Sequence, residues 1–198
     1  MADTYRTITG PSEATYTEKR SKFLAFAFPV TSTEEVKEII TGLNKEYFDA
    51  RHVCWAYMLG PERLEYRSND NGEPSGTAGK PILGQINSFE LTNVLIAVVR
   101  YFGGVKLGTP GLIVAYRQSA RLALENAEIV ERHITKLIRF TYPYMVMNDV
   151  MKLSRGEGVK MLDSAFDNTC SMTLEVELDR AEALTKKLLD IDGLTLDS

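Results

Sequence analysis

Apolar residues in the first two thirds of the chain occur in short continuous runs. Three of these runs predict strands: Ser21–Val30 (SKFLAFAFPV), Val53–Leu59 (VCWAYML) and Thr92–Phe102 (TNVLIAVVRYF). The last is rich in β-branched residues, which favour strands. Runs that are apolar at every position, without alternation, are typical of strands covered on both faces.

Helical spacing appears between these runs. Ser32 is placed as an N-cap, with Glu35 three positions later as its capping-box partner. Apolar residues follow at helical spacing as far as Leu43, so a helix is predicted after Ser32. A second helix is predicted over Gly111–Ala127, where Leu112, Tyr116, Ala120, Ala123 and Ala127 share one side. Strands and helices therefore alternate in this part of the chain.

Residues 134–198 show the pattern of a separate small unit. The expected order is strand, helix, two strands around a turn, helix and a short strand: Lys136–Tyr144, Val146–Leu153, Val159–Phe166, Cys170–Leu178, Ala181–Asp190 and Leu194–Leu196. This β-α-β-β-α-β order is the ferredoxin-like plan. We predict an α+β protein of two domains, an N-terminal domain over residues 1–133 and a ferredoxin-like C-terminal domain over residues 134–198.

Composition and charge narrow the classes of protein. Hydrophobic residues make up 44% and charged residues 25% of the 198 positions, which excludes a disordered or fibrous chain. The net charge of −4 excludes a uniformly basic coat for nucleic acid. Residues 1–121 carry 14 basic and 13 acidic side chains, whereas residues 122–198 carry 9 and 14, so the acidity lies in the C-terminal part.

Targeting and cysteine patterns are those of a cytoplasmic protein. No apolar run approaches the ~18 residues that a membrane span needs, and we expect no membrane contact. Cys54 and Cys170 are far apart and form no Cys-x-x-Cys pair, so neither a disulfide framework nor a cysteine zinc site is expected.

Glycine is concentrated in one window. Eight of the 14 glycines lie between Gly72 and Gly111, in two segments, residues 69–81 (NDNGEPSGTAGKP) and residues 100–111 (RYFGGVKLGTPG). Glycine is favoured where the backbone turns with positive φ or approaches another group closely. We expect the two segments to meet in space beside cationic side chains.

The second segment has the pattern of an anion site. It lies between a predicted strand and a predicted helix, with Thr109 as an expected N-cap and Pro110 as the first helical residue. Free N–H groups at a helix start, together with the helix dipole and Lys106, attract anions. Arg117 and Arg121 follow at i and i+4 on the helix. Residues 72–121 hold five basic and two acidic residues, a local excess of positive charge.

A purely structural interpretation of the same residues stays open. Glycine clusters often form tight turns only, and Glu125 is placed to neutralise Arg121 on a solvated helix face. Phe102 fits a core position better than a platform for bases. The segments match neither the Gly-x-x-x-x-Gly-Lys-Ser/Thr loop nor the Gly-x-Gly-x-x-Gly fingerprint. Proline also lacks an N–H, so Pro110 removes one donor from the anion site.

These motifs together resemble those of the IMPACT/YigZ family. The resemblance rests on the two glycine segments, on Lys19–Ala25 (KRSKFLA) and Ala50–Tyr57 (ARHVCWAY) before them, and on Ala115-Tyr116 after them. It implies a first domain like domain IV of elongation factor G, a ribosomal-protein domain 2-like fold, and a second domain like its ferredoxin-type domain V. It also implies a link to translation. Asn71 departs from the aspartate usual in the family's Asp-Gly-Glu-Pro motif.

Catalytic patterns are few. His52 and Cys54 are two positions apart on a predicted strand and so share a face, which leaves a Cys–His nucleophile pair as an alternative to inert packing of Cys54. Asp70 and Glu73 are candidates for a divalent ion or, alternatively, for a structural turn. A Ser-His-Asp pattern is not found. A non-enzymatic protein without cofactor or metal is therefore favoured over an enzyme.

The leading hypothesis is a translation-associated regulator that binds RNA, the ribosome or a translation factor through a basic, glycine-rich surface. Tyr101 is the candidate ring for stacking a base. The other candidate binding residues are Arg51, His52, Glu73, Lys80, Arg100, Gly103, Gly104, Lys106, Gly108, Arg117 and Arg121. The more acidic C-terminal domain is expected to contact a protein partner. Two alternatives remain: an enzyme or sensor for a phosphorylated small molecule or nucleotide, and a protein-interaction module with purely structural glycines.

Overall fold

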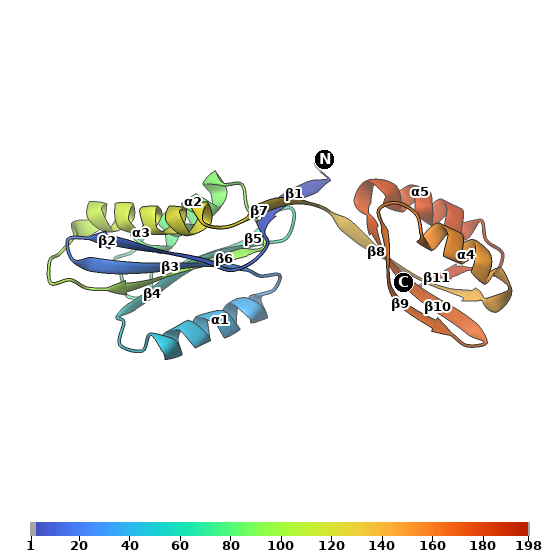
Figure 1. Ribbon diagram of the computed structural model, residues 1–198, viewed down its shortest axis with the longest axis horizontal. Helices are drawn as coiled ribbons and strands as arrows, with labels where there is room; N and C mark the ends of the chain where they lie inside the picture. The colour runs from blue at the N-terminus through green and yellow to red at the C-terminus, as the bar shows by residue number, and fades with distance from the viewer. Residues whose placement is uncertain (1–2, 198) are drawn as a thin grey trace. The chain divides into compact units, whose positions relative to one another are not determined.

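The computed structural model describes residues 3–197, which form two compact units. Residues 5–132 make the first unit, and residues 133–197, with residues 3 and 4, make the second. Each unit has its own sheet, helices and hydrophobic core (Figure 1). The predicted α+β fold with two domains is confirmed. In residues 3–197 no helix combines the length and the apolar character that crossing a bilayer requires.

The first unit is built on a five-stranded sheet in the order β2-β3-β6-β4-β5. All neighbouring strands are antiparallel. The strands are β2 (Ser12–Glu18), β3 (Ser21–Pro29), β4 (His52–Leu59), β5 (Glu65–Asn69) and β6 (Val94–Tyr101). Seven of the eight residues of the central strand β6 are buried, which explains the continuous apolar run in its sequence.

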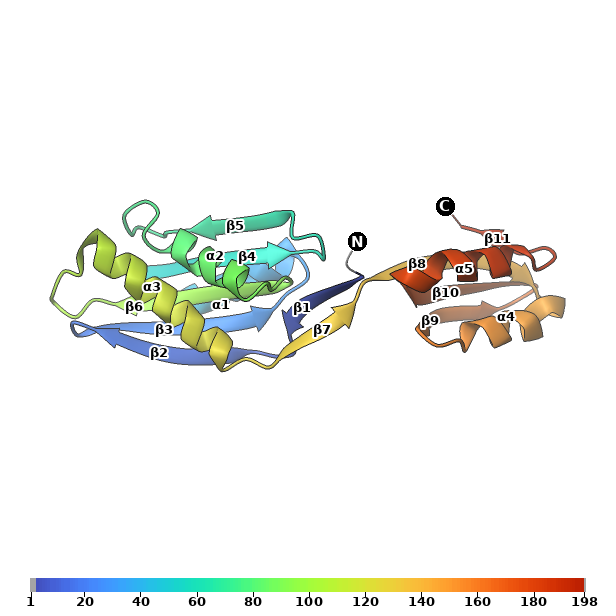
Figure 2. The same cartoon turned by 90° about the horizontal axis from the view of Figure 1, so that it is seen from above.

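Helices cover both faces of this sheet (Figures 1 and 2). α2 (Gly79–Ser88) and α3 (Gly108–Glu125) lie on one face, where they bury Phe23, Ile96 and Tyr116. α1 (Thr33–Glu46) lies on the other face, where Leu43 packs beside Val99. Because side chains alternate along β6, the strand contributes residues to two separate hydrophobic layers, one on each face of the sheet.

The helix predicted after Ser32 is confirmed, and its cap has the expected chemistry. The Glu35 N–H donates to Ser32 Oγ at 3.2 Å. The Glu35 carboxylate reaches one residue further back than in a standard capping box and accepts from the N–H of Thr31 at 2.8 Å. The start predicted for α3 is wrong. The helix begins at Gly108, so Thr109 lies inside the helix and not before it. No side chain caps this helix.

The second unit is a four-stranded sheet in the order β11-β8-β10-β9, with α4 and α5 packed on one face. Its elements are β8 (Thr135–Pro143), the 3-10 turn η1 (Tyr144–Val146), α4 (Met147–Ser154), β9 (Val159–Phe166), β10 (Thr169–Glu177), α5 (Leu178–Leu189) and β11 (Thr195–Leu196). The predicted ferredoxin-like order is confirmed. A separate two-stranded sheet pairs β1 (Thr4–Ile8) with β7 (Ile129–His133).

Candidate functional site

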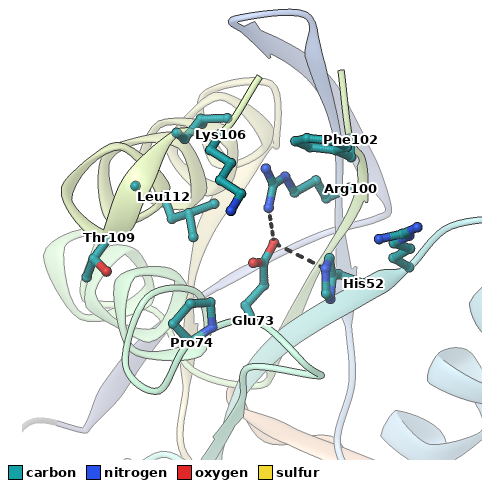
Figure 3. A pocket seen from close by; sticks show the side chains of 11 residues that line it. His52, Glu73, Pro74, Arg100, Phe102, Lys106, Thr109 and Leu112 are labelled. Carbon is teal, nitrogen blue, oxygen red and sulfur yellow. Dashed lines mark hydrogen bonds and ion pairs between the residues drawn. The ribbon is translucent and has the colours of Figure 1, made fainter. Parts of the chain in front are cut away.

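A pocket of about 400 Å³ lies at the N-terminal end of α3 in the first unit (Figure 3). Four segments meet there: the start of β4, the loop before α2, the end of β6 and the turn into α3. The lining residues are Arg51, His52, Glu73, Pro74, Arg100, Phe102, Lys106, Leu107, Gly108, Thr109 and Leu112. Both glycine segments of the sequence thus contribute to one cavity.

A buried carboxylate forms the floor of this pocket. The Glu73 side chain is 3% exposed, and its Oε1 accepts from Arg100 Nη1 at 2.6 Å and from the Tyr116 hydroxyl at 2.7 Å. Arg100 comes from the sheet and Tyr116 from α3, so one oxygen atom joins three segments. Charge-assisted hydrogen bonds of this length are among the stronger polar interactions in proteins.

Arg100 is held between aromatic rings. Its guanidinium carbon lies 5.6 Å from the centroid of the Phe23 ring and 5.8 Å from that of Phe102, within cation–π range. Nη2 donates to Ser21 Oγ at 3.4 Å. The Arg100 side chain is 7% exposed, and its Nε has no hydrogen-bond partner among residues 3–197. Arg100 is thus held mainly by its bonds to Glu73 and Ser21 and by the two rings.

His52 presents one fixed ring nitrogen to the pocket. Its Nδ1 lies 2.8 Å from the carbonyl oxygen of Asn71, and a carbonyl only accepts, so Nδ1 carries the proton and donates. The neutral ring then has Nε2 as an acceptor, 3.9 Å from Glu73 Oε1. Asn71 acts here through its backbone carbonyl, so this contact does not depend on the side chain at position 71.

Cys54 is not an activated nucleophile. It is fully buried, and Sγ donates to the Asp70 carbonyl at 2.8 Å. Burial raises the pKa of the thiol to about 12, so the thiolate that nucleophilic attack needs is scarce near neutral pH. The Tyr116 hydroxyl lies 3.5 Å from the sulfur, and burial also raises the pKa of Tyr116. The Cys–His pair considered from the sequence is therefore excluded as a nucleophilic device.

The first glycine segment is organised around Asp70 and leaves few amides for a ligand. Asp70 Oδ2 accepts from Gly76 N–H at 2.9 Å, and Oδ1 accepts from the N–H groups of Ala78 at 3.1 Å and Gly79 at 2.8 Å. Burial raises the pKa of Asp70, but these three N–H donors outweigh it, and the net shift is downward. Asp70 caps α2 from outside the helix, and this segment contributes Glu73 and Pro74 to the pocket.

The divalent-ion interpretation of Asp70 and Glu73 is not supported. Both oxygens of Asp70 accept backbone amides, and Oε1 of Glu73 accepts from Arg100 and Tyr116. Within the described chain, no three His, Cys, Asp or Glu side chains are grouped for a metal ion. The structural turn, the other interpretation of these residues, fits the hydrogen bonds.

Replacing Asp70 with alanine is expected to lower the free energy of unfolding by about 1–2 kcal/mol, because α2 loses its capping carboxylate. The folded-state pKa lies below the unfolded value, so this contribution is present above about pH 4 and is lost as the pH falls further. Urea unfolding at neutral and at acid pH measures both effects. Glu62→Ala, a change at an exposed loop acid, is the control. An equal loss from both variants would contradict this account.

Half of the residues selected from the sequence line the pocket, and half do not. Those in the pocket are Arg51, His52, Glu73, Arg100, Lys106 and Gly108. Gly108 has φ +74, a conformation that glycine adopts without strain, and it opens α3 beside Lys106. The residues outside it are Lys80, Tyr101, Gly103, Gly104, Arg117 and Arg121.

Tyr101 lies outside the pocket because its side chain is on the other face of the sheet. Successive side chains of β6 point to opposite faces, so Arg100 in the pocket places Tyr101 on the α1 side of the sheet. There its hydroxyl donates to Asp49 Oδ1 at 2.8 Å, and this hydrogen bond raises the pKa of Tyr101 to about 12. The ring in the pocket is Phe102, which is 50% exposed, so the core position expected for Phe102 is wrong.

The remaining selected residues have other environments. Arg117 is exposed on α3 beyond the pocket, and Arg121 Nε lies 2.7 Å from Glu125 Oε1, the neutralising pair considered from the sequence. Lys80 is exposed in the first turn of α2. The Gly103 N–H donates to Ser21 Oγ at 3.3 Å, and a Cβ at Gly103 would overlap the backbone of Arg20. The nearby Gly104 has φ +86 and turns the chain toward α3.

Sequence reasoning missed part of the site. The helical pattern places Tyr116 on the apolar side of its helix and does not show that its hydroxyl bonds to Glu73. Leu112, one turn earlier, lines the pocket. The spacing of Leu112 and Tyr116 at i and i+4 signals a shared face, but only the fold shows that Glu73 lies opposite that face. Pro74 enters the pocket from the loop before α2, and Thr109 from the first turn of α3, and no local pattern predicts either contact.

The fold and the pocket define a class of protein: a two-domain α+β chain whose first domain carries a cationic pocket where a helix begins. The chain belongs to the IMPACT family, because residues 19–124 match the family model described as the Impact N-terminal domain. The IMPACT family member YvyE of Bacillus subtilis is 35% identical over 144 residues, which is 73% of this chain and 66% of that protein.

Two further similarities extend over more of the chain. An IMPACT family member of Haemophilus influenzae is 30% identical over 174 residues, 87% of this chain and 84% of that protein. A solved structure described as a hypothetical protein has a TM-score of 0.78 and 26% identity, and the match covers 99% of this chain and 97% of that one. Similarity in sequence and in fold thus reaches beyond the pocket domain.

Proposed function

We propose that this protein is a translation-associated regulator that contacts RNA phosphates through the pocket of its first domain. The observation that carries the proposal is that Arg51 and Lys106 both line one cavity, which also contains the start of α3, an 18-residue helix. The positive end of the helix dipole and two exposed cations favour an anion in this cavity. Membership of the IMPACT family supports the connection with translation.

The partner chemistry follows from the composition of the pocket wall. Arg51 and Lys106 are exposed and free to reach phosphate oxygens, whereas Arg100 is committed to Glu73. Phe102, half-exposed beside them, offers a ring on which an unstacked base can lie. The second unit, which holds most of the acidic excess, is proposed to contact a protein partner and not the RNA.

Changing Arg51 and Lys106 together to alanine is expected to weaken binding of a labelled single-stranded RNA. Each lost phosphate contact removes about 0.7 from the slope of log affinity against log salt, so the double variant should lose about 1.4. Titrations at several salt concentrations measure this slope. Lys37→Ala with Lys45→Ala, two exposed positions on α1, removes the same charge from the opposite face of the sheet and serves as the matched control.

Two results would overturn the proposal. One is an absence of RNA binding by the unmodified protein at low salt. The other is an equal loss of affinity in the pocket variant and in the α1 control, which would indicate nonspecific attraction to the whole surface.

A phosphorylated small molecule is the second candidate ligand, and the size of the pocket favours it. A volume of about 400 Å³ falls within the range of about 300–1,000 Å³ found for small-molecule sites. A ligand that binds only the native state stabilises it by RT ln(1 + [L]/Kd), so the melting temperature rises with ligand concentration. A melting-temperature increase with nucleotides, absent in the Arg51→Ala and Lys106→Ala double variant, would support this candidate.

A further inference from the structure

The cationic pocket contains a carboxylate at its centre. Glu73 lies between Lys106 and Thr109 on the α3 side and His52 on the β4 side (Figure 3). A phosphate placed directly against this carboxylate would be repelled, because like charges at contact distance oppose binding. The group that lies on Glu73 must therefore be a hydrogen-bond donor, whereas the phosphate belongs beside Lys106 and the start of α3.

The carboxylate has one oxygen available for such a donor. Arg100 and Tyr116 both bond to Oε1, and the 3.9 Å distance from His52 Nε2 is also measured to Oε1. In Figure 3 the dashed lines end on this one oxygen, and the second oxygen of Glu73 carries none. The buried ion pair with Arg100 fixes the orientation of the carboxylate before a ligand binds. The loss of side-chain entropy at Glu73 on binding is therefore small.

A second acceptor lies next to the first. His52 is fixed by its bond to the Asn71 carbonyl, so in the neutral ring Nε2 offers a lone pair 3.9 Å from Glu73 Oε1. The 3.9 Å distance is measured to the oxygen already bound to Arg100 and Tyr116, so the free Glu73 oxygen and the His52 nitrogen are separate acceptors, and each takes its own donor from a ligand. The pocket thus selects a ligand that carries an anionic group at one end and hydroxyl groups close to it.

We propose that Glu73 accepts a hydrogen bond from a ribose 2′-hydroxyl, and that the pocket thereby distinguishes RNA from DNA. This inference rests on the proposed contact with RNA phosphates and adds the recognition of the sugar. A ribose unit carries a hydroxyl donor close to a phosphate, and the 2′-hydroxyl is the group that separates RNA from DNA. Acidic side chains bind ribose hydroxyls in the same way in dinucleotide-binding folds. Arg100 acts as a positioning residue for the carboxylate.

Three probes of one base sequence test the inference on the full chain: labelled oligouridylate, its 2′-deoxy counterpart and its 2′-O-methyl counterpart. The hydrogen bond to a charged acceptor predicts a preference of about tenfold or more for the unmodified RNA. The 2′-O-methyl probe has lost the donor and should bind as weakly as the deoxy probe. Because the change is made in the ligand, the result does not depend on the stability of a variant.

Two variants then assign the preference to Glu73. Glu73→Gln keeps the size of the side chain and removes its charge, so the ratio of RNA to DNA affinity should fall toward one. Arg51→Ala should weaken both probes equally and leave the ratio unchanged, because Arg51 contacts phosphate only. Near-equal affinity of the unmodified protein for RNA and DNA would overturn the sugar inference and leave the proposed function standing. Absence of binding to all three probes would overturn both.

Discussion

Replacing Glu73 with alanine is expected to lower the free energy of unfolding of the first unit by about 3–5 kcal/mol, because the change breaks a buried ion pair from one side only. Arg100 would keep its charge in a site where its side chain is 7% exposed. The Tyr116 hydroxyl, itself buried, would lose an acceptor at 2.7 Å. Urea unfolding followed by the fluorescence of Trp55, the only tryptophan in the sequence, reports this unit.

The size of the loss has a direct control. The double variant Glu73→Leu with Arg100→Met removes both charges and fills the site with apolar side chains of similar volume. Substitutions of this kind are often neutral or stabilising, so the double variant should unfold at a higher urea concentration than Glu73→Ala. Equal losses in the two variants, or a Glu73→Ala protein as stable as the original, would show that the ion pair does not stabilise the unit as described.

Replacing Phe140 with alanine is expected to cost the second unit about 3–5 kcal/mol, the usual loss for a large aromatic residue in a core. Phe140 is fully buried on β8 and packs beside Tyr142 in a core that the second unit has for itself. The cores of the two units share no residue. Circular dichroism should therefore show an early transition from the second unit, while the transition reported by Trp55 stays where it was.

Phe166→Ala is the matched control, since Phe166 lies on β9 of the same sheet and is 52% exposed. Its loss of stability should be smaller, because about half of the residue's surface is already in water. RNA binding by the Phe140→Ala protein should also persist at temperatures where the second unit has unfolded. A single transition that shifts equally for both probes would show that the two units unfold together.

The elements that the sequence predicts well are those that bury an unbroken run or repeat a clear period. The strand predicted over Thr92–Phe102 is β6 in the structure, and seven of its eight residues are buried. The edge strands β2 and β5 were not predicted, because the sequences of both are largely polar. In β2 half-buried and exposed residues alternate, and most residues of β5 are exposed. Helix α2 was not predicted for another reason. The side chain that caps it belongs to Asp70, nine residues before Gly79, and a local sequence pattern does not reveal such a contact.

The candidate site was predicted in its location more than in its contents. Both glycine segments reach the pocket, but three amides of the first are bonded to Asp70, so the first contributes the side chains of Glu73 and Pro74 to the pocket. Tyr101 and Phe102 exchange the roles expected of them, because the faces of a strand depend on its register in the sheet. The partnership of Glu73 with Tyr116 joins positions 43 residues apart and needs the fold itself.

One oxygen of Glu73 bonds to Arg100 on β6 and to Tyr116 on α3. These two bonds limit which substitutions at position 73 the protein can accept. A change at position 73 that alters ligand preference also weakens the scaffold, so we expect a compensating change at Arg100 to accompany it. Arg51, Phe102 and Lys106 are solvent-exposed at the rim and can vary without that penalty. New specificities should therefore arise by exchange of rim residues around a constant centre, and a combinatorial library restricted to those three positions is the economical way to search for them.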